Sequence, residues 1–339
     1  MNTTTVPRFY FALCFLLLAG CTTIPDKTPE WVLFPERTYA PAEYLFAMGS
    51  GPTGRIAKKE AVQRLNQLFE LRMDEADQLT VQTYRQLGFP AGFRPVFSET
   101  APESKERPSL SRIRTGKSSA DREGNHRVLV YISRAETARP VIARLEKGAS
   151  DTRRLLAQAK AAPEPFSRFA SQRAALLRAL QTEKPAAQAA LLYPAAVRGF
   201  NLGYTISDVL DGAANDAQAV TFRTDITGDS GDIIKKTVEN TLRGIGFVPA
   251  ADGLLTVTGS ISTSLDRKHE DQNARAEYHL RLRVQDHSGK TLAQIDTSKT
   301  EQFPLMEAEV LASRSVQQTI LTELRKEVID ALNRSAGVN

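Results

Sequence analysis

The stretch Ala276-Glu277-Tyr278-His279-Leu280-Arg281-Leu282-Arg283-Val284-Gln285 alternates apolar and polar residues without a break. Successive side chains of a strand point to opposite faces of its sheet, so this pattern predicts an antiparallel strand with one buried face and one wet face. The following residues, Asp286-His287-Ser288-Gly289-Lys290, predict a hairpin turn, and 292–297 predict the returning strand.

Residues on both sides of this hairpin extend the pattern into an α+β domain over 196–339. Before the hairpin, alternating segments at 219–226 and 255–261 predict strands, and a helix is expected from 230–232 to Gly244 or Gly246. The order β-α-β-β-β-α predicts helices packed on a mainly antiparallel sheet. After the hairpin, one apolar stripe predicts the last helix: Ala308, Ala312, Val316, Ile320, Leu324, Val328 and Ala331.

Another α+β domain is predicted over 31–150. Apolar runs at 44–49 and 128–132 predict strands, and helices are expected over about 56–87 and 135–147. Between them, 99–127 is a charged arm, interpreted as a mobile loop or a solvated hairpin. Its basic residues are Lys105, Arg107, Arg112, Arg114, Lys117, Arg122 and Arg127.

The segment 151–195 is rich in alanine and predicts a helical linker, with Pro163, Pro165 and Pro185 as helix breaks. The predicted fold class is therefore α+β. It has two small domains, each with helices packed on a mainly antiparallel sheet, and they are joined by this alanine-rich helical segment.

The N-terminus carries the features of an export signal. Arg8 precedes an apolar run over 9–18, which is shorter than the about 20 residues that a membrane-spanning helix needs. Leu18-Ala19-Gly20-Cys21 then resembles a bacterial lipobox, which implies that 1–20 is removed and that the Cys21 thiol is lipidated. An ordinary cleaved signal peptide with an incidental cysteine is the alternative. The polar, proline-containing stretch 21–30 is interpreted as a lipidated tether.

Composition narrows the functional classes. Cys14 and Cys21 are the two cysteines, so after processing no thiol remains for a disulfide, a thiolate metal site or cysteine catalysis. The formal net charge of +5 falls to about +4 without Arg8, which does not indicate nucleic-acid binding. The charge suits a location near anionic envelope polymers.

Gly49-Ser50-Gly51-Pro52-Thr53-Gly54 matches G-x-G-x-x-G between a strand and a helix. A dinucleotide site also needs a compact βαβ unit and an acidic residue at the next strand end, whereas Glu70 lies within the predicted helix. The glycines are instead interpreted as a turn that needs glycine backbone conformations.

No other group of residues identifies a chemistry. The histidines have no metal-ligand spacing, and they are His126, His269, His279 and His287. The chain has no G-x-S-x-G motif, and no carboxylate pair stands out for glycan hydrolysis. We therefore assign no catalytic, cofactor-binding or metal-binding residues from the sequence.

Residues 29–150 resemble the LPP-twenty lipoprotein family. The resemblance rests on Pro29-Glu30-Trp31-Val32, on 44–51 opening a long helix, and on Arg127-Val128-Leu129-Val130-Tyr131-Ile132-Ser133-Arg134 before a helix. The long charged arm departs from the family pattern. The family has no established catalytic residues, so the resemblance implies scaffolding in the cell envelope and transfers no active site.

Together these observations favour a non-enzymatic lipoprotein of the outer membrane, anchored on the periplasmic side through Cys21. Thr22 is not the aspartate that retains such proteins at the inner membrane, which is what the lipobox resemblance implies for sorting. The expected role is a scaffold or assembly factor for envelope or surface structures. Expected partners are the membrane and an envelope protein, with an anionic glycan as the alternative, and no cofactor is expected. An enzyme acting on cell-wall glycan, a glycan-binding protein and a nucleotide or small-ligand binder are the alternatives.

Overall fold

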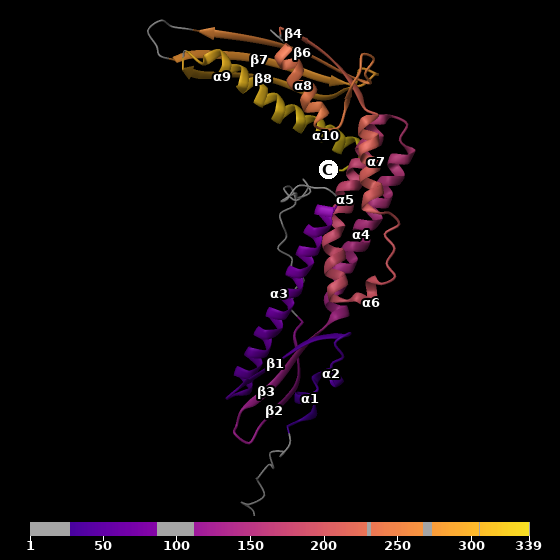
Figure 1. The fold of residues 1–339 in the computed structure, drawn as a ribbon, viewed down its shortest axis with the longest axis vertical. Helices are drawn as coiled ribbons and strands as arrows, with labels where there is room; N and C mark the ends of the chain where they lie inside the picture. The colour runs from indigo at the N-terminus through magenta and orange to yellow at the C-terminus, as the bar shows by residue number, and fades with distance from the viewer. Residues whose placement is uncertain (1–27, 87–111, 229–231, 267–272, 305, 339) are drawn as a thin grey trace, which may run out of the picture. The chain divides into compact units, whose positions relative to one another are not determined.

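The computed structural model describes residues 28–86, 112–228, 232–266, 273–304 and 306–338. The chain divides into two compact units, and each is assembled from separate stretches of the sequence. Both units combine helices with a sheet, which confirms the α+β class (Figure 1). Of the described residues, unit 1 contains 28–81, 112–142 and 186–199, and unit 2 contains 82–86, 143–185 and those after 199.

Unit 1 is built around a three-stranded antiparallel sheet in the order β1-β3-β2. Long helices that begin here, α3 and α4, continue into unit 2. The elements are α1 (Glu30–Leu33), α2 (Pro35–Thr38), β1 (Tyr44–Gly51), α3 (Gly54–Gln86), β2 (Arg114–Ala120), β3 (His126–Ser133), α4 (Arg134–Ala161) and α6 (Pro194–Val197).

The helix α3 lies directly against β1, and the contact depends on glycine. A Cβ on Gly49 would lie 2.2 Å from the Ala57 carbonyl oxygen and 2.4 Å from the Ala61 nitrogen. The side chains of Ala57, Ala61 and Leu65 are fully buried at this contact. Neither Gly49, Gly51 nor Gly54 has a positive φ angle. The strand and helix are as predicted, but the predicted reason for the glycines was wrong. Gly49 and Gly51 allow close packing against α3, and none of the three glycines takes a backbone conformation that only glycine favours.

Aromatic rings cover the opposite face of this sheet. The Tyr39 ring lies 4.7 Å from the Tyr131 ring, and the Tyr44 ring lies 5.4 Å from Tyr131 in an edge-on arrangement. Burial raises the pKa of Tyr39, with smaller contributions from the two neighbouring tyrosines. A Cβ on Gly116 would meet the Tyr39 hydroxyl, so β2 also carries a glycine where another element packs closely.

Part of the charged arm is a strand of the sheet. Residues 114–120 form β2, which pairs with β3 through a tight turn. The Asp121 carboxylate accepts hydrogen bonds from the backbone N–H groups of Glu123 and Asn125, and Gly124 takes a φ of 83°. The hairpin interpretation is therefore correct for this half of the arm and the loop interpretation is wrong there; 99–111 lies outside the described residues.

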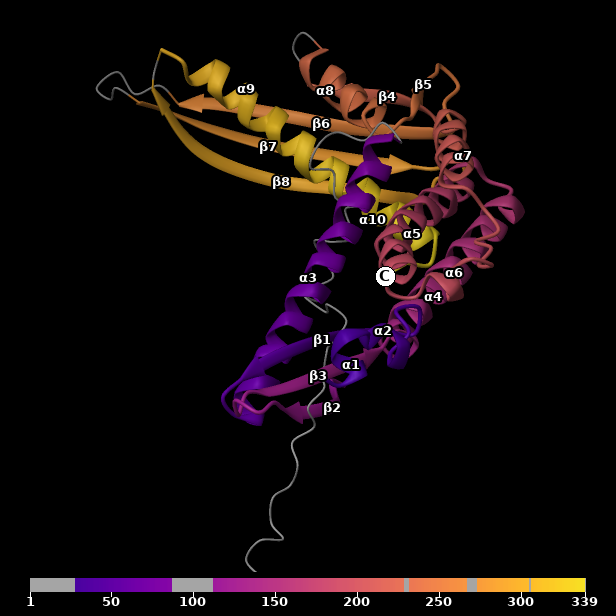
Figure 2. The same cartoon turned by 60° about the horizontal axis from the view of Figure 1, so that its bottom comes forward.

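Unit 2 contains a five-stranded sheet in the order β5-β4-β6-β7-β8. Figures 1 and 2 show α8 and the C-terminal helix on one face of this sheet. Its elements are α5 (Pro165–Leu192), α7 (Ile206–Gln218), β4 (Thr221–Thr227), α8 (Ile233–Arg243), β5 (Val248–Pro249), β6 (Leu255–Asp266), β7 (Asn273–Gln285), β8 (Thr291–Pro304), α9 (Ala308–Thr319), a π-helical turn (Ile320–Leu324) and α10 (Arg325–Ser335).

The predicted half-buried strand is β7, and its apolar residues all face the core. The Tyr278 hydroxyl lies 3.3 Å from the Ser315 hydroxyl and 3.2 Å from the Thr319 hydroxyl, so the polar end of this ring is satisfied on α9. The hairpin turn forms as predicted around the Asp286 carboxylate. The sheet is mixed, however, because β4 runs parallel to β5 and β6, and α8 makes the crossover.

The last helix contains a π-helical turn. An α-helix has about 3.6 residues per turn, so a stripe repeated every four residues drifts by about 40° at each step. The wide turn at Ile320–Leu324 inserts an extra residue and returns the stripe to the sheet. All members of the predicted stripe, from Ala308 to Ala331, are buried as a result.

The predicted helical linker is a pair of long helices. The turn between α4 and α5 falls at 162–164, beside Pro163 and Pro165 as expected. Pro185 does not break a helix, which corrects the prediction, since α5 continues through it to Leu192. The residues predicted as a separate linker belong to both compact units. No helix among the described residues has an apolar stretch long enough to cross a membrane.

Candidate functional site

Within its described residues, the structure does not bring together the histidines that the sequence analysis considered. Cys21 lies outside the described residues, as does His269. His126 is the first residue of β3 in unit 1, whereas His279 lies on β7 and His287 lies in the turn after it. Within the described ranges, no group of three His, Cys, Asp or Glu side chains is arranged to hold a metal ion.

The G-x-G-x-x-G loop is occupied by the chain's own carboxylate. The backbone N–H of Ser50 donates to Glu60 Oε2 at 2.6 Å, and Arg64 donates both to Glu60 Oε1 at 2.6 Å and to the Met48 carbonyl at 3.2 Å. The hydrogen bond from Ser50, followed by the charge of Arg64, lowers the pKa of Glu60. A phosphate at this backbone N–H would have to displace an ionised side chain, which disfavours the nucleotide-binding alternative.

A groove in unit 2 brings basic and apolar side chains together. Its volume is about 1420 Å³, and α4 and α5 form one wall while the π-helical turn and α10 form the other. Its apolar floor is made by Leu155, Ala174, Leu321, Ile329 and Val338. Leu321 is 43% exposed, which is high for a leucine inside a hollow.

Positive charge surrounds this floor. The lining contains five basic side chains but only two carboxylates, those of Asp151 and Asp330. We call this site the basic groove and define it by the floor residues above together with its rim of Arg154, Arg178, Arg325, Lys326 and Arg334.

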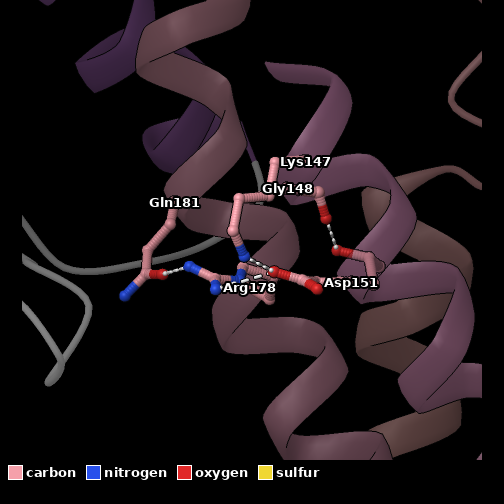
Figure 3. Close-up of polar contacts among 6 residues, drawn as sticks. Lys147, Gly148, Asp151, Arg178 and Gln181 are labelled. Atoms are coloured by element: carbon pink, nitrogen blue, oxygen red, sulfur yellow. Dashed lines mark hydrogen bonds and ion pairs between the residues drawn. The ribbon is translucent and has the colours of Figure 1, made fainter. Parts of the chain in front are cut away.

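The Asp151 carboxylate is neutralised within the protein (Figure 3). It accepts a hydrogen bond from Arg178 Nη2 at 2.8 Å and one from Lys147 Nζ at 2.9 Å. Gln181 holds the other side of the Arg178 guanidinium at 3.1 Å. Burial alone raises the pKa of Asp151, but the bond from Lys147 and the charge of Arg178 outweigh it, so the pKa lies below its usual value. Asp151 is therefore a structural carboxylate and does not act as a proton donor near neutral pH.

Arg325 and Lys326 have a different environment. Both side chains are exposed at the start of α10, and neither makes an ion pair with any residue that the structure describes. Burial, and then the charge of Arg325, lowers the pKa of Arg173 on α5. Arg173 donates to Asn333 Oδ1 at 3.1 Å, so α5 and α10 bring the positive charges of Arg173 and Arg325 near one another.

The helix pair that forms one wall is held by a close approach at Gly148. A Cβ on Gly148 would lie 2.2 Å from Thr182 Cγ2. The Thr182 hydroxyl donates to the Ala179 carbonyl at 2.6 Å and lies 3.3 Å from the Tyr204 hydroxyl. This packing fixes the spacing of α4 and α5 one turn away from Asp151.

We expect Gly148→Ala to lower the free energy of unfolding by about 1–3 kcal/mol, because the added methyl overpacks the helix contact. Thr182→Ser in the same chain removes the obstructing Cγ2 and keeps the hydroxyl, so the double variant should recover most of the loss. Denaturant unfolding followed by circular dichroism measures both. Equal destabilisation of the single and double variants would show that Thr182 is not the obstacle.

A smaller cavity of about 360 Å³ lies beside the β7–β8 turn. His287 Nδ1 lies 3.7 Å from Glu164 Oε2, and both side chains are more than half exposed. The hydrogen bond from Ser288 lowers the pKa of Asp286 despite partial burial. Burial raises the pKa of Glu183 on α5, but Glu183 lines neither this cavity nor the basic groove.

Sequence reasoning missed the basic groove. Arg154 and Arg178 lie in the segment interpreted as a linker, and Arg325 and Lys326 lie on the polar side of a helix selected for its apolar stripe. The usable signal was the stripe itself, because its spacing of four residues calls for a π-helical turn, and such turns often occur at functional sites.

No family model and no curated protein matches this chain. Among solved structures, a secreted protein of Helicobacter pylori is 10% identical, with a TM-score of 0.33 over 86% of this chain and 97% of that chain. A minor lipoprotein of Acinetobacter baumannii is 9% identical, with a TM-score of 0.25 over 35% of this chain and 94% of that chain. At these TM-scores the likenesses carry no argument about function.

Proposed function

We propose that this protein is a lipid-anchored protein of the bacterial cell envelope that works by binding and positioning other envelope components. The carrying observation is the apolar run that ends in Leu18-Ala19-Gly20-Cys21, because it combines an export signal with the thiol that lipid attachment needs. Attachment to the outer membrane on its periplasmic side, and membership of the LPP-twenty lipoproteins, belong to the same proposal.

Two features of the site support a binding role. The groove's Asp151 is held ionised by Lys147 and Arg178, so it is unsuited to proton donation. The rest of the groove combines an exposed leucine with unpaired cations, which is a combination found on recognition surfaces. A scaffold or assembly factor is the function that these features favour.

The anchoring step is tested by Cys21→Ala and its matched control Cys14→Ala. Cells grown with labelled palmitate should incorporate label into the wild-type protein and into Cys14→Ala, because Cys14 leaves with the signal. Cys21→Ala should lose the label and no longer fractionate with outer membranes, since stable anchoring needs the attached acyl chains. A labelled Cys21→Ala protein, or an unlabelled wild type, would refute lipid attachment at this residue.

A further inference from the structure

We propose that the basic groove binds an acidic amphipathic helix of a partner protein. This inference deepens the proposed binding role and depends on it only in taking binding as the protein's mode of action. It starts from the shape of the site. An open groove between helical walls is a common receptor for a helix that inserts one apolar face and leaves its flanks at the rim.

The floor of the groove provides the apolar half of the interaction. Leu321 projects from the π-helical turn and is 43% exposed, and Ile329 lies two turns further along the same wall. Leu155 on the facing wall is buried and closes the floor. Without the π-helical turn, Leu321 and Ile329 would be rotated away from their present positions, so the wide turn shapes this surface.

The rim provides the charge. Arg154 donates a hydrogen bond to Gln158, and none of Arg154, Arg325 and Lys326 has an ionic partner among the residues described. Lys326 and Arg325 are adjacent on α10, and Arg154 faces them from α4. The lining holds five basic side chains and two carboxylates, and one of these carboxylates, Asp151, is already paired with Arg178 and Lys147. This excess of positive charge favours an acidic ligand, since complementary charge across an interface sets both the rate of encounter and the choice of partner.

Other ligand classes fit these side chains less well. Sugar rings stack on aromatic side chains, and none of the described side chains that line the groove is aromatic. An acyl chain needs an enclosed apolar tunnel, whereas the cations here ring an open floor. A helix with acidic flanks satisfies both the exposed leucine and the unpaired cations.

The test begins with a phage-displayed library of random peptides selected on the purified full chain. We expect enrichment of peptides with Asp and Glu beside apolar residues at helical spacing. Their affinity is then measured by fluorescence anisotropy for wild type and for the double variant Arg325→Glu/Lys326→Glu. Reversal of both charges should weaken binding at least about tenfold and reduce its dependence on salt.

The matched control is Lys58→Glu/Lys59→Glu on α3. These are also adjacent, exposed helical cations that form no ion pair with described residues, and they belong to unit 1. The control changes the net charge equally and should bind the peptides as the wild type does. Unchanged circular dichroism and melting temperature of both double variants establish that the fold is kept.

Several outcomes would overturn the proposal. Failure of the selection, selected peptides without acidic residues, or equal affinity for both double variants each contradicts it. Binding to phosphatidylglycerol vesicles but not to the peptides, lost in Arg325→Glu/Lys326→Glu, would assign the groove to lipid. A wild-type dimer in sedimentation experiments that is monomeric in the same variant would assign the groove to a second copy of the chain. None of these measurements depends on Cys21, so a failure here is distinct from a failure of lipid attachment.

Discussion

In the Gly49→Ala variant, unit 1 should unfold at a much lower denaturant concentration than in wild type. Its free energy of unfolding should fall by at least about 3 kcal/mol. The new Cβ would lie 2.2 Å from the Ala57 carbonyl oxygen and 2.4 Å from the Ala61 nitrogen. These are backbone atoms of α3, so no side chain can rotate to relieve the clash. Helix and strand would have to separate along the contact that buries Ala57, Ala61 and Leu65.

The matched control is Gly54→Ala, five residues further along the same glycine motif. A Cβ on Gly54 lies 3.7 Å from the His126 ring, an ordinary contact, and Gly54 has no positive φ angle. This variant should be neutral or more stable by about 0.4–1 kcal/mol, because alanine restricts the unfolded chain more than glycine does.

Trp31, the chain's single tryptophan, lies in α1 and therefore reports on unit 1. Its fluorescence during urea unfolding, compared with circular dichroism of the whole chain, measures both glycine variants. A Gly49→Ala protein with the unfolding midpoint of Gly54→Ala would contradict the close approach of α3 and β1.

Phe247→Ala should lower the free energy of unfolding of unit 2 by about 3–5 kcal/mol, the range for removing a buried phenylalanine ring from a core. Phe247 is 2% exposed, and its ring meets Phe169 of α5 at 5.7 Å and Phe166 at 6.4 Å, both edge-on. Gly246, with a φ of 106°, turns the chain so that this ring enters the core. The ring joins α5 to the sheet layer, so its loss affects both.

Val248→Ala is the control for this second variant, because it truncates the next residue, which is 38% exposed. Its effect should stay below about 0.5 kcal/mol. Chemical denaturation followed at the helical circular dichroism band compares the two. Similar midpoints for Phe247→Ala and Val248→Ala would mean that the aromatic contacts with α5 do not stabilise unit 2.

The fold was predictable where apolar residues recur at the spacing of a strand or a helix and so form one buried face. Tyr278 and Leu280 alternate with polar residues and are buried, and Val316 and Ile320 repeat along one helix face and are buried as well. The parallel pairing of β4 with β6 was not predictable, because each strand shows the same alternation whichever neighbour it pairs with. The predicted helix break at Pro185 was wrong because tertiary packing keeps α5 helical on both sides of this proline.

The candidate site was less accessible to sequence reasoning for a related reason. Arg154, Arg178 and Arg325 converge only after α5 and the C-terminal helix are placed on opposite sides of a groove. In the sequence each of them is one polar residue on the outside of an amphipathic helix, where arginine is ordinary. Cys21 behaves differently, since lipid attachment depends on a local motif and not on distant residues, and it stays a prediction.

The interleaving of the two units constrains how a newly made chain reaches its final structure. Arg134 donates to the carbonyls of Pro41 and Tyr44 and also to those of Leu191 and Leu192, so one side chain ties together three separate stretches of unit 1. A chain that becomes available from its N-terminus therefore presents β1 and α3 well before 186–199 can join them. Until that stretch arrives, the apolar face of β1 and α3 is without part of its cover, and this is the stage at which a holding chaperone would protect the chain.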